Sequence, residues 1–554
     1  MSKLLNSNKL QIDKKIFIIG IFLTTIAISP WWTSDGFNVP KLFFLVVTAL
    51  VVIPNLLKNQ TLVRNLTRNR TVVLTLFFPL NLILVFILNN ANKVQQLYGE
   101  LGRRTGLLTY FCCYLIFLFA LLRNNQRFTH AVLKTFLYLG AISATYGLLQ
   151  PYGIFKINGL SSKNMTPYSF FGNVDFNSGF LGLVSIVLLA KFIYDSNTVI
   201  LKSVTFILLI YLYVSIYLTN AQQGFVVSFS GAVILFMIHI YLHFRSKFKF
   251  SILLSLFLLI QFFLSLFNRG YFNNLVYDPS VQARNYYWRA GWEMTMSNPI
   301  IGVGLDRYSD WYWAYRDQIT INVLGPDDFT TSAHNIFLDI SSSGGFPLLI
   351  VYLMISALTF TKGISVFRKM TSPSYAFSAL FASWIGFNVY SLVGIGQIGV
   401  FIWGWIFAGL ILGWDSNFLS DDIFSFTRLK KYFLINSISV IVSVFLVLPL
   451  IKETYSIRQA KIINTSEYYL SYLKSNRIEP FNISFAINKL NEFGLEEQSL
   501  KYIRQSLLKY PNNYQLWTLQ YSHKYSTQQE KLLAYENLLK LNFYNRYLAE
   551  QKSK

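Results

Sequence analysis

The sequence predicts an all-α protein that crosses a membrane many times. Hydrophobic residues make up 53% of the chain and charged residues only 13%, about half the charged share that is usual for a soluble domain. A soluble protein of this size could not keep so much apolar surface in water. The net charge of +23 would suggest nucleic acid in a soluble chain. Here it fits the basic loops that membrane proteins keep on the cytoplasmic side, so we expect membrane lipids and no nucleic acid as partners.

Thirteen apolar runs are long enough to cross about 30 Å of hydrocarbon. They lie near residues 16–33, 41–57, 71–89, 106–122, 131–150, 176–194, 199–218, 223–243, 250–268, 336–360, 375–393, 398–413 and 432–452. The expectation is therefore a membrane domain over residues 1–454 with about 12–13 transmembrane helices.

The distribution of Lys and Arg predicts the orientation of these spans. Basic residues gather in alternate connecting segments, at 58–70, 123–127, 244–250, 361–369 and 428–431, and are absent from the short loops 219–222 and 394–397. Since basic loops stay in the cytoplasm, we expect a cytoplasmic N-terminus. With an odd number of spans, the C-terminal tail then lies outside, as do the segments 90–105, 151–175 and the long loop 269–335.

The long outer loop contains a predicted helix at 285–297, which Pro299 ends. Gly302 and Gly304 then make a turn in "NPIIGVG". Because no third glycine and no βαβ pattern follow, we do not expect a nucleotide site there.

Arginines stand on the outer side, where basic residues are scarce: Arg103 and Arg104 lie before the fourth span, and the long loop holds Arg284, Arg289, Arg307 and Arg316. A guanidinium can bind two phosphate oxygens at once, so such a cluster suits a diphosphate-linked lipid. Two other interpretations stay open. Long translocated loops tolerate arginine, and arginines near a membrane bind lipid headgroups without specificity.

His334 is one of five histidines and stands where the long loop enters the tenth span. Nearby arginines should lower its pKa, because positive charge disfavours imidazolium. A neutral imidazole can accept the proton of a hydroxyl group, and Asn335 and Asp339 are close enough to orient the ring or an acceptor. Alternatively, His334 bonds a loop carbonyl at the interface, while Asn335 and Asp339 cap and solvate the head of the span.

Several segments resemble the O-antigen ligase and polymerase superfamily, in the family's order. They are "LGRRTGLLTY" (101–110), "FFGNVDFNSGFLGL" (170–183), "RNYYW…NPIIGVG" (284–304), "SAHNIFLDISSSGGFPLLIVYL" (332–353) and "QIGVFIWGWIFAGLILG" (397–413). The resemblance extends from residue 16 to about residue 415.

The resemblance implies a membrane glycosyltransferase of the GT-C type that needs no metal and no other cofactor. It implies transfer of glycan from an undecaprenyl-diphosphate carrier to a hydroxyl of a lipid, glycan or protein acceptor, at the outer face of the bacterial plasma membrane. By position, Arg284 matches the family's diphosphate-contacting arginine, and His334 its base or acceptor-orienting histidine. Arg103 or Arg104 matches the basic residue before the fourth span.

One position departs from the family pattern. Many ligases have Ser-Arg-Gly at the start of the eighth span, where this chain has "NAQQG" (220–224). Gln223 can donate hydrogen bonds to a phosphate but brings no charge. Either another arginine supplies that charge, or this branch uses a different donor or has another role.

Residues 455–554 are predicted to form a small helical domain outside the membrane. "LLKYPNN" and "LLKLNFYN" recur about 31 residues apart, which resembles tetratricopeptide repeats with their usual period of 34. An ordinary helical domain fits the same pattern. Because repeat arrays present concave surfaces to other chains, we hypothesise that this domain recruits the acceptor or envelope-assembly proteins.

The function most favoured by these observations is that of an O-antigen ligase. A repeat-unit polymerase and a protein O-oligosaccharyltransferase would use the same donor chemistry. A solute transporter, such as an inorganic-carbon carrier, and a noncatalytic scaffold are the alternatives from other classes. The charged residues gather in outer loops and the spans show no chain of embedded carboxylates, which argues against ion-coupled transport.

Overall fold

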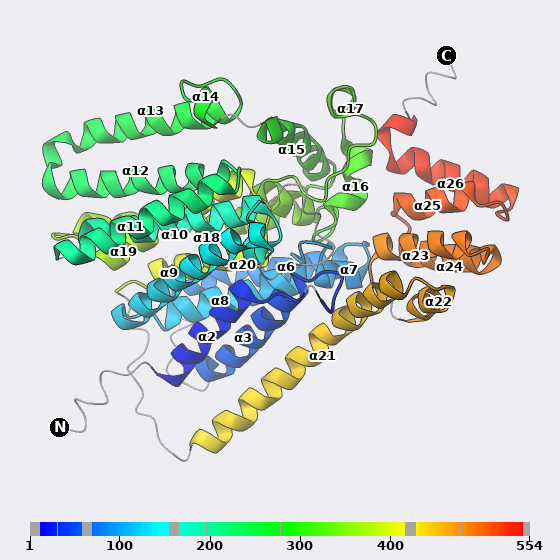
Figure 1. The fold of residues 1–554 in the computed structure, drawn as a ribbon, viewed down its shortest axis with the longest axis horizontal. Helices are drawn as coiled ribbons and strands as arrows, with labels where there is room; N and C mark the ends of the chain where they lie inside the picture. Colours follow the sequence, from blue (N-terminus) through cyan, green and yellow to red (C-terminus); the bar gives the residue numbers. More distant parts are fainter. Residues whose placement is uncertain are drawn as a thin grey trace.

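The protein is a bundle of helices with a smaller helical unit at one end (Figure 1). The computed structural model describes residues 11–29, 31–57, 69–153, 166–195, 198–276, 279–415, 428–475 and 478–546. Within these ranges the regular structure is helical, without strands. The predicted all-α polytopic membrane fold is therefore confirmed. Residues 58–68 of the first basic segment and 154–165 of the second outer segment lie outside the described residues.

Nine of the thirteen predicted spans correspond to helices, among the described residues, that are long and apolar enough to cross a membrane. They are α5 with α6 (Arg70–Thr75 and Phe77–Leu88), α9 (Gln126–Leu149), α10 (Val174–Tyr194), α11 (Val199–Leu218), α12 (Gln223–His243), α13 (Phe248–Leu266), α18 (Ile336–Lys369), α19 (Tyr375–Val393) and α21 (Arg428–Ile463).

Three of the other predicted spans form shorter apolar helices: α3 (Val39–Leu57), α8 (Leu107–Leu122) and α20 (Ile398–Leu412). The first predicted span forms α2 (Ile12–Ile26), which has 15 residues. At 1.5 Å per residue, the 15 residues of α20 reach about 22 Å, less than the hydrocarbon thickness. All 15 are buried, so other helices rather than lipid surround α20. A hydrophobic run in the sequence does not distinguish these two environments.

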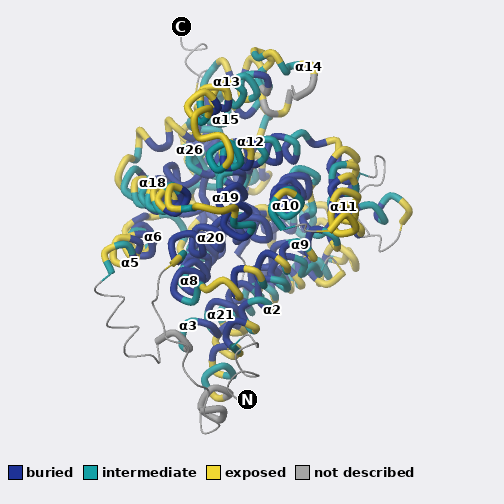
Figure 2. The backbone as a smooth tube through the Cα atoms, turned by 90° about the vertical axis from the view of Figure 1, so that its left-hand side faces the viewer, coloured by how far each residue is buried: buried dark blue, intermediate teal, exposed yellow. Residues whose placement is uncertain are grey.

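The middle of the bundle is closely packed, and its outer helices expose apolar side chains. In the most apolar window of α19, 78% of the residues are buried, against 17% in the helix that contains α13. Figure 2 shows α19 and α20 dark blue near the centre and α11 largely yellow at the edge. The outward side chains of α11 and α13 include Ile207 and Phe250. Such continuous apolar faces are expected where helices meet lipid.

The smaller helices lie at the end of the bundle away from the N-terminus (Figure 1). The long loop supplies α14 (Asn273–Val276), α15 (Pro279–Ser297), α16 (Tyr308–Tyr315) and α17 (Gln318–Leu324), and α7 (Lys93–Tyr98) precedes α8. The C-terminal helices are α22 (Ser466–Lys474), α23 (Pro480–Glu492), α24 (Glu496–Lys509), α25 (Tyr514–Ser522) and α26 (Gln528–Leu541). The C-terminal helices have a hydrophobic core of their own, and α21 reaches them without a break at residue 454.

The "NPIIGVG" segment after α15 binds along a break in α18. Gly345 interrupts α18 with a positive φ of 73°. The interruption leaves backbone N–H and carbonyl groups of α18 free to bond a neighbouring segment of the chain. Val303 N–H donates to the Ser342 carbonyl at 2.7 Å, and Phe346 N–H donates to the Pro299 carbonyl at 2.7 Å. Gly302 has a φ of +59°, and a Cβ there would lie 2.4 Å from the Ser342 carbonyl oxygen. The glycines therefore serve close backbone packing.

We predict that Gly302→Ala destabilises the protein more than Gly494→Ala does. Both glycines have left-handed φ values, but the site of a Cβ at Gly494 is open. The left-handed conformation costs each alanine about 1–2 kcal/mol, and only Gly302→Ala adds a backbone overlap. Thermal unfolding in detergent measures the difference, and equal losses of Tm would contradict this account of the loop.

Candidate functional site

The candidate site forms where several helices begin at the end of the bundle that carries α15. Arg103 lies just before α8, Asp175 in the first turn of α10, Gln223 at the start of α12, and His334 just before α18. Arg284 reaches them from α15. Helix N-termini carry partial positive charge, so the backbone adds to the positive potential of the guanidinium groups.

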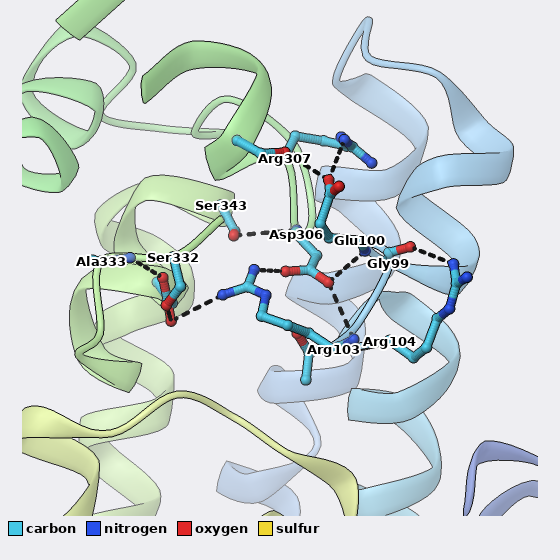
Figure 3. A network of polar contacts seen from close by, with 12 residues as sticks. Gly99, Glu100, Arg103, Arg104, Asp306, Arg307, Ser332, Ala333 and Ser343 are labelled. Atoms are coloured by element: carbon cyan, nitrogen blue, oxygen red, sulfur yellow. Dashed lines mark hydrogen bonds and ion pairs between the residues drawn. The ribbon is translucent and has the colours of Figure 1, made fainter. Parts of the chain in front are cut away.

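Arg103 is the centre of a buried network that connects three distant segments (Figure 3). Its guanidinium pairs with Asp306 of the long loop, and at 3.5 Å with Asp339 of α18. Asp306 also accepts the Glu100 N–H at 2.8 Å and the Thr105 N–H at 3.1 Å. This carboxylate therefore fixes both the arginine and the backbone of its loop.

Asp339 holds the loop that leads into α18. It accepts hydrogen bonds from the Ser332 hydroxyl at 2.7 Å and from the Ala333 N–H at 2.9 Å. Ser332 Oγ in turn accepts the His334 N–H at 2.9 Å. Asp339 thus supports His334 through the backbone, and its predicted contact with the ring or with an acceptor remains a prediction.

Arg104 points away from Arg103 (Figure 3). Its guanidinium is fully buried, 2.8 Å from Asp35 and paired with Glu479 of the C-terminal helices. Although burial opposes the charged form, Glu479 and then Asp35 raise the pKa of Arg104. Arg104 is therefore a permanent buried cation with protein partners, and its predicted contact with the donor remains a prediction.

Arg284 occupies the other part of the site and is almost fully buried. It donates to the Val393 carbonyl and lies 3.3 Å from Asp175, whose side chain is one-third exposed. Gln223 is near the same turn, because a Cβ on Gly394 would be 2.8 Å from its amide nitrogen. That nitrogen is buried without a hydrogen-bond partner among the described residues. An amide donor and a guanidinium thus converge beside the end of α19.

His334 lies within the electrostatic reach of both arginines. Burial, then Arg284, then Arg103 lower its pKa to about 3. The imidazole is therefore neutral at physiological pH and can accept a hydrogen bond. Its ring centroid is 5.5 Å from that of Tyr287 on α15. The residue has a φ of +54°, an uncommon conformation for histidine that the Ser332 contact supports.

Two of the other predicted site residues have visible structural partners. Asn335 caps α18, since its side-chain oxygen accepts the Phe337 N–H at 3.0 Å and the Leu338 N–H at 3.2 Å. Arg289 is exposed and pairs with Asp317, away from the buried network. The role of Asn335 toward an acceptor remains a prediction. The donor-binding role predicted for Arg289 is untested, and we do not carry it into the proposed function, because its exposed side chain already pairs with Asp317.

Sequence reasoning did not identify three residues that complete the site: Asp175, Tyr287 and Asp306. Asp175 and Tyr287 lie inside segments that resemble the family, and Asp306 follows the second glycine of the "GVG" turn. Their positions in or next to the segments that resemble the family were the available signal. Within the described part of the chain, no three His, Cys, Asp or Glu side chains gather in a way that could hold a metal ion.

Residues 204–353 match the family model described as O-antigen ligase. This match supports the resemblance of the chain to the O-antigen ligase and polymerase superfamily over that region. The matched region contains Gln223, Arg284 and His334, whereas Arg103 and Arg104 lie before it. Members of the family are glycosyltransferase-like enzymes. No curated protein matches the chain.

We predict that Asp306→Asn destabilises the protein by about 3 kcal/mol, because it removes a partner of a buried charge. Asp317→Asn is the matched control: it removes the partner of exposed Arg289 and should cost less than about 1 kcal/mol. Thermal unfolding of the two variants in detergent compares them. Equal losses would show that Asp306 does not fix the network.

Proposed function

We propose that the protein transfers a glycan from undecaprenyl diphosphate to an acceptor hydroxyl at the outer face of the bacterial plasma membrane. The observation that carries this proposal is that buried Arg284 and the unpartnered amide of Gln223 meet at the end of α19. Arg103 is in turn connected through Asp339 and Ser332 to the loop that presents His334. A phosphate-binding cation beside a proton acceptor is what attack by an alcohol on a diphosphate-activated sugar requires. The match of residues 204–353 to the O-antigen ligase family model supports the same reaction.

In the proposed donor complex, Arg284 and Gln223 bind the diphosphate. The guanidinium of Arg284 can exchange partly exposed Asp175 for phosphate oxygens, since arginine binds such oxygens bidentately. The buried amide of Gln223, which has no partner among the described residues, supplies a further donor. Arg103 contributes charge while its two carboxylates hold it in place.

His334 accepts the proton in the proposed transfer step. The acceptor oxygen forms a bond to the anomeric carbon as the bond from that carbon to the diphosphate oxygen breaks. The diphosphate leaves with the electron pair of that bond, and the hydroxyl proton passes to the imidazole. A bound diphosphate is negatively charged, so it raises the pKa of His334 from its low value. The imidazole therefore becomes a better proton acceptor when the donor is present.

Ligation, repeat-unit polymerisation and glycan transfer to protein share this donor step and differ in the acceptor, which is a lipid, a glycan or a protein. We favour ligation, and we propose that the C-terminal helices face outward, where the acceptor or envelope-assembly proteins can reach them. Alternate basic loops of the sequence support this orientation.

We predict that His334→Ala and Arg284→Ala each reduce glycan transfer by at least about 100-fold, the scale expected for loss of a proton acceptor or of a transition-state cation. Lipid-linked glycan should accumulate in cells at normal protein levels. The matched control is Arg289→Ala, which removes an exposed arginine of the same helix and should leave transfer within about twofold. Normal glycan transfer with loss of solute uptake in the first two variants would instead support a transporter.

We predict that Arg284→Gln raises the pKa of His334 from about 3 toward the ordinary value, because it removes a nearby positive charge. With less positive charge nearby, the His334 ring takes up a proton at a higher pH, so its pKa rises. NMR titration of ¹³C-histidine-labelled protein measures this shift, with the His334 signal assigned by His334→Gln. Arg289→Gln should leave the titration unchanged. No shift in Arg284→Gln would contradict the proposed electrostatic coupling.

A further inference from the structure

The C-terminal helices contact the site loop of residues 99–106 through a buried ion pair. Glu479, which immediately precedes α23, pairs with Arg104, and both side chains are at most 1% exposed. Among the described residues from 466 to 546, Glu479 has the only carboxylate that is paired with this loop. Asn92 strengthens the contact by donating to the Lys509 carbonyl at 3.1 Å. The C-terminal unit is thus fixed directly against the segment that carries Arg103.

The backbone conformation of the turn that carries Arg103 and Arg104 sets the directions of both side chains. Arg104 has a left-handed φ of +58°, a conformation that contacts must maintain in a residue other than glycine. Its guanidinium also donates to the Gly99 carbonyl at 3.2 Å, and Asp35 accepts the Gly102 N–H at 3.3 Å. Glu479 therefore supports the backbone conformation that directs Arg103 toward the opposite side of the turn.

A continuous series of contacts leads from Arg103 to His334. Arg103 pairs with Asp339, and Asp339 accepts hydrogen bonds from Ser332 and Ala333. The Ser332 hydroxyl accepts the backbone N–H of His334. Each of these contacts is buried or partly buried, so loss of one leaves a polar group that water cannot fully satisfy.

We propose that Arg104 and Glu479 are positioning residues, through which the docked C-terminal helices hold the loop that presents His334. The consequence for catalysis rests on the proposed function, whereas the structural coupling does not. The C-terminal unit then has a role inside the active site as well as any role in recruiting partners.

Hydrogen–deuterium exchange of the full-length protein in detergent tests this coupling. Glu479→Ala should increase exchange at least about fivefold at the amides of Ala333 and His334, since local opening governs exchange. Glu479→Gln keeps a hydrogen-bond acceptor for Arg104 and should restore most of the protection. Glu530→Ala is the matched control, because it breaks the Arg504 pair and the α26 cap within the same unit, away from the loop; its effect should stay within α24–α26.

Increased exchange that is confined to the C-terminal helices in Glu479→Ala would overturn the proposal. If Glu479→Ala does not accumulate, Glu479→Gln still tests it, with a smaller rise expected at the same two amides. Glycan transfer provides the second readout: Glu479→Ala should accumulate lipid-linked glycan, and Glu479→Gln should transfer it at half the normal rate or better. Normal transfer by His334→Ala would refute the proposed function alone, because the exchange result decides the coupling separately.

Discussion

The guanidinium of Arg103 is shared between Asp306 and Asp339, which lie 203 and 236 residues away in the sequence. A buried ion that lacks a partner lowers the stability of the folded state by several kcal/mol. The charges of Arg103, Asp306 and Asp339 are therefore all compensated only when the three segments that carry them are in place. This constraint explains the neighbouring features. The glycines of the "GVG" turn allow the chain to approach α18 closely, and that approach brings Asp306 to Arg103.

The two consecutive arginines of the loop point in different directions and pair with different carboxylates. Arg103 faces the site, and Arg104 faces the acidic side chains of Asp35 and Glu479. Two adjacent positive charges would repel each other in a low-dielectric interior, and separate carboxylates compensate each of them. Burial, and then Arg284 and Arg103, lower the pKa of His334 and keep its ring neutral, which is the protonation state that accepting a hydroxyl proton requires.

Local patterns in the sequence predicted the helices well, because apolar runs and caps depend on nearby residues. The run around His334 predicted both α18 and the cap by Asn335, and Pro299 marked the end of the α15 region. The pairing of Arg103 with Asp306 and of Arg104 with Glu479 could not be predicted, since nothing in a local pattern distinguishes adjacent arginines whose partners are hundreds of residues away. The sequence also did not predict that the short apolar helices are buried in protein. α20 is as apolar as a lipid-facing span, and only its packing shows that protein surrounds it.

Cryo-electron microscopy of the protein in lipid nanodiscs, with a non-hydrolysable undecaprenyl-diphosphate analogue, tests the central claim most directly. We expect density for the two phosphates against the Arg284 guanidinium and the Gln223 amide, with the His334 ring facing the position of the sugar. Phosphate density at the other end of the bundle, or against Arg289 with Arg284 still paired to Asp175, would contradict it.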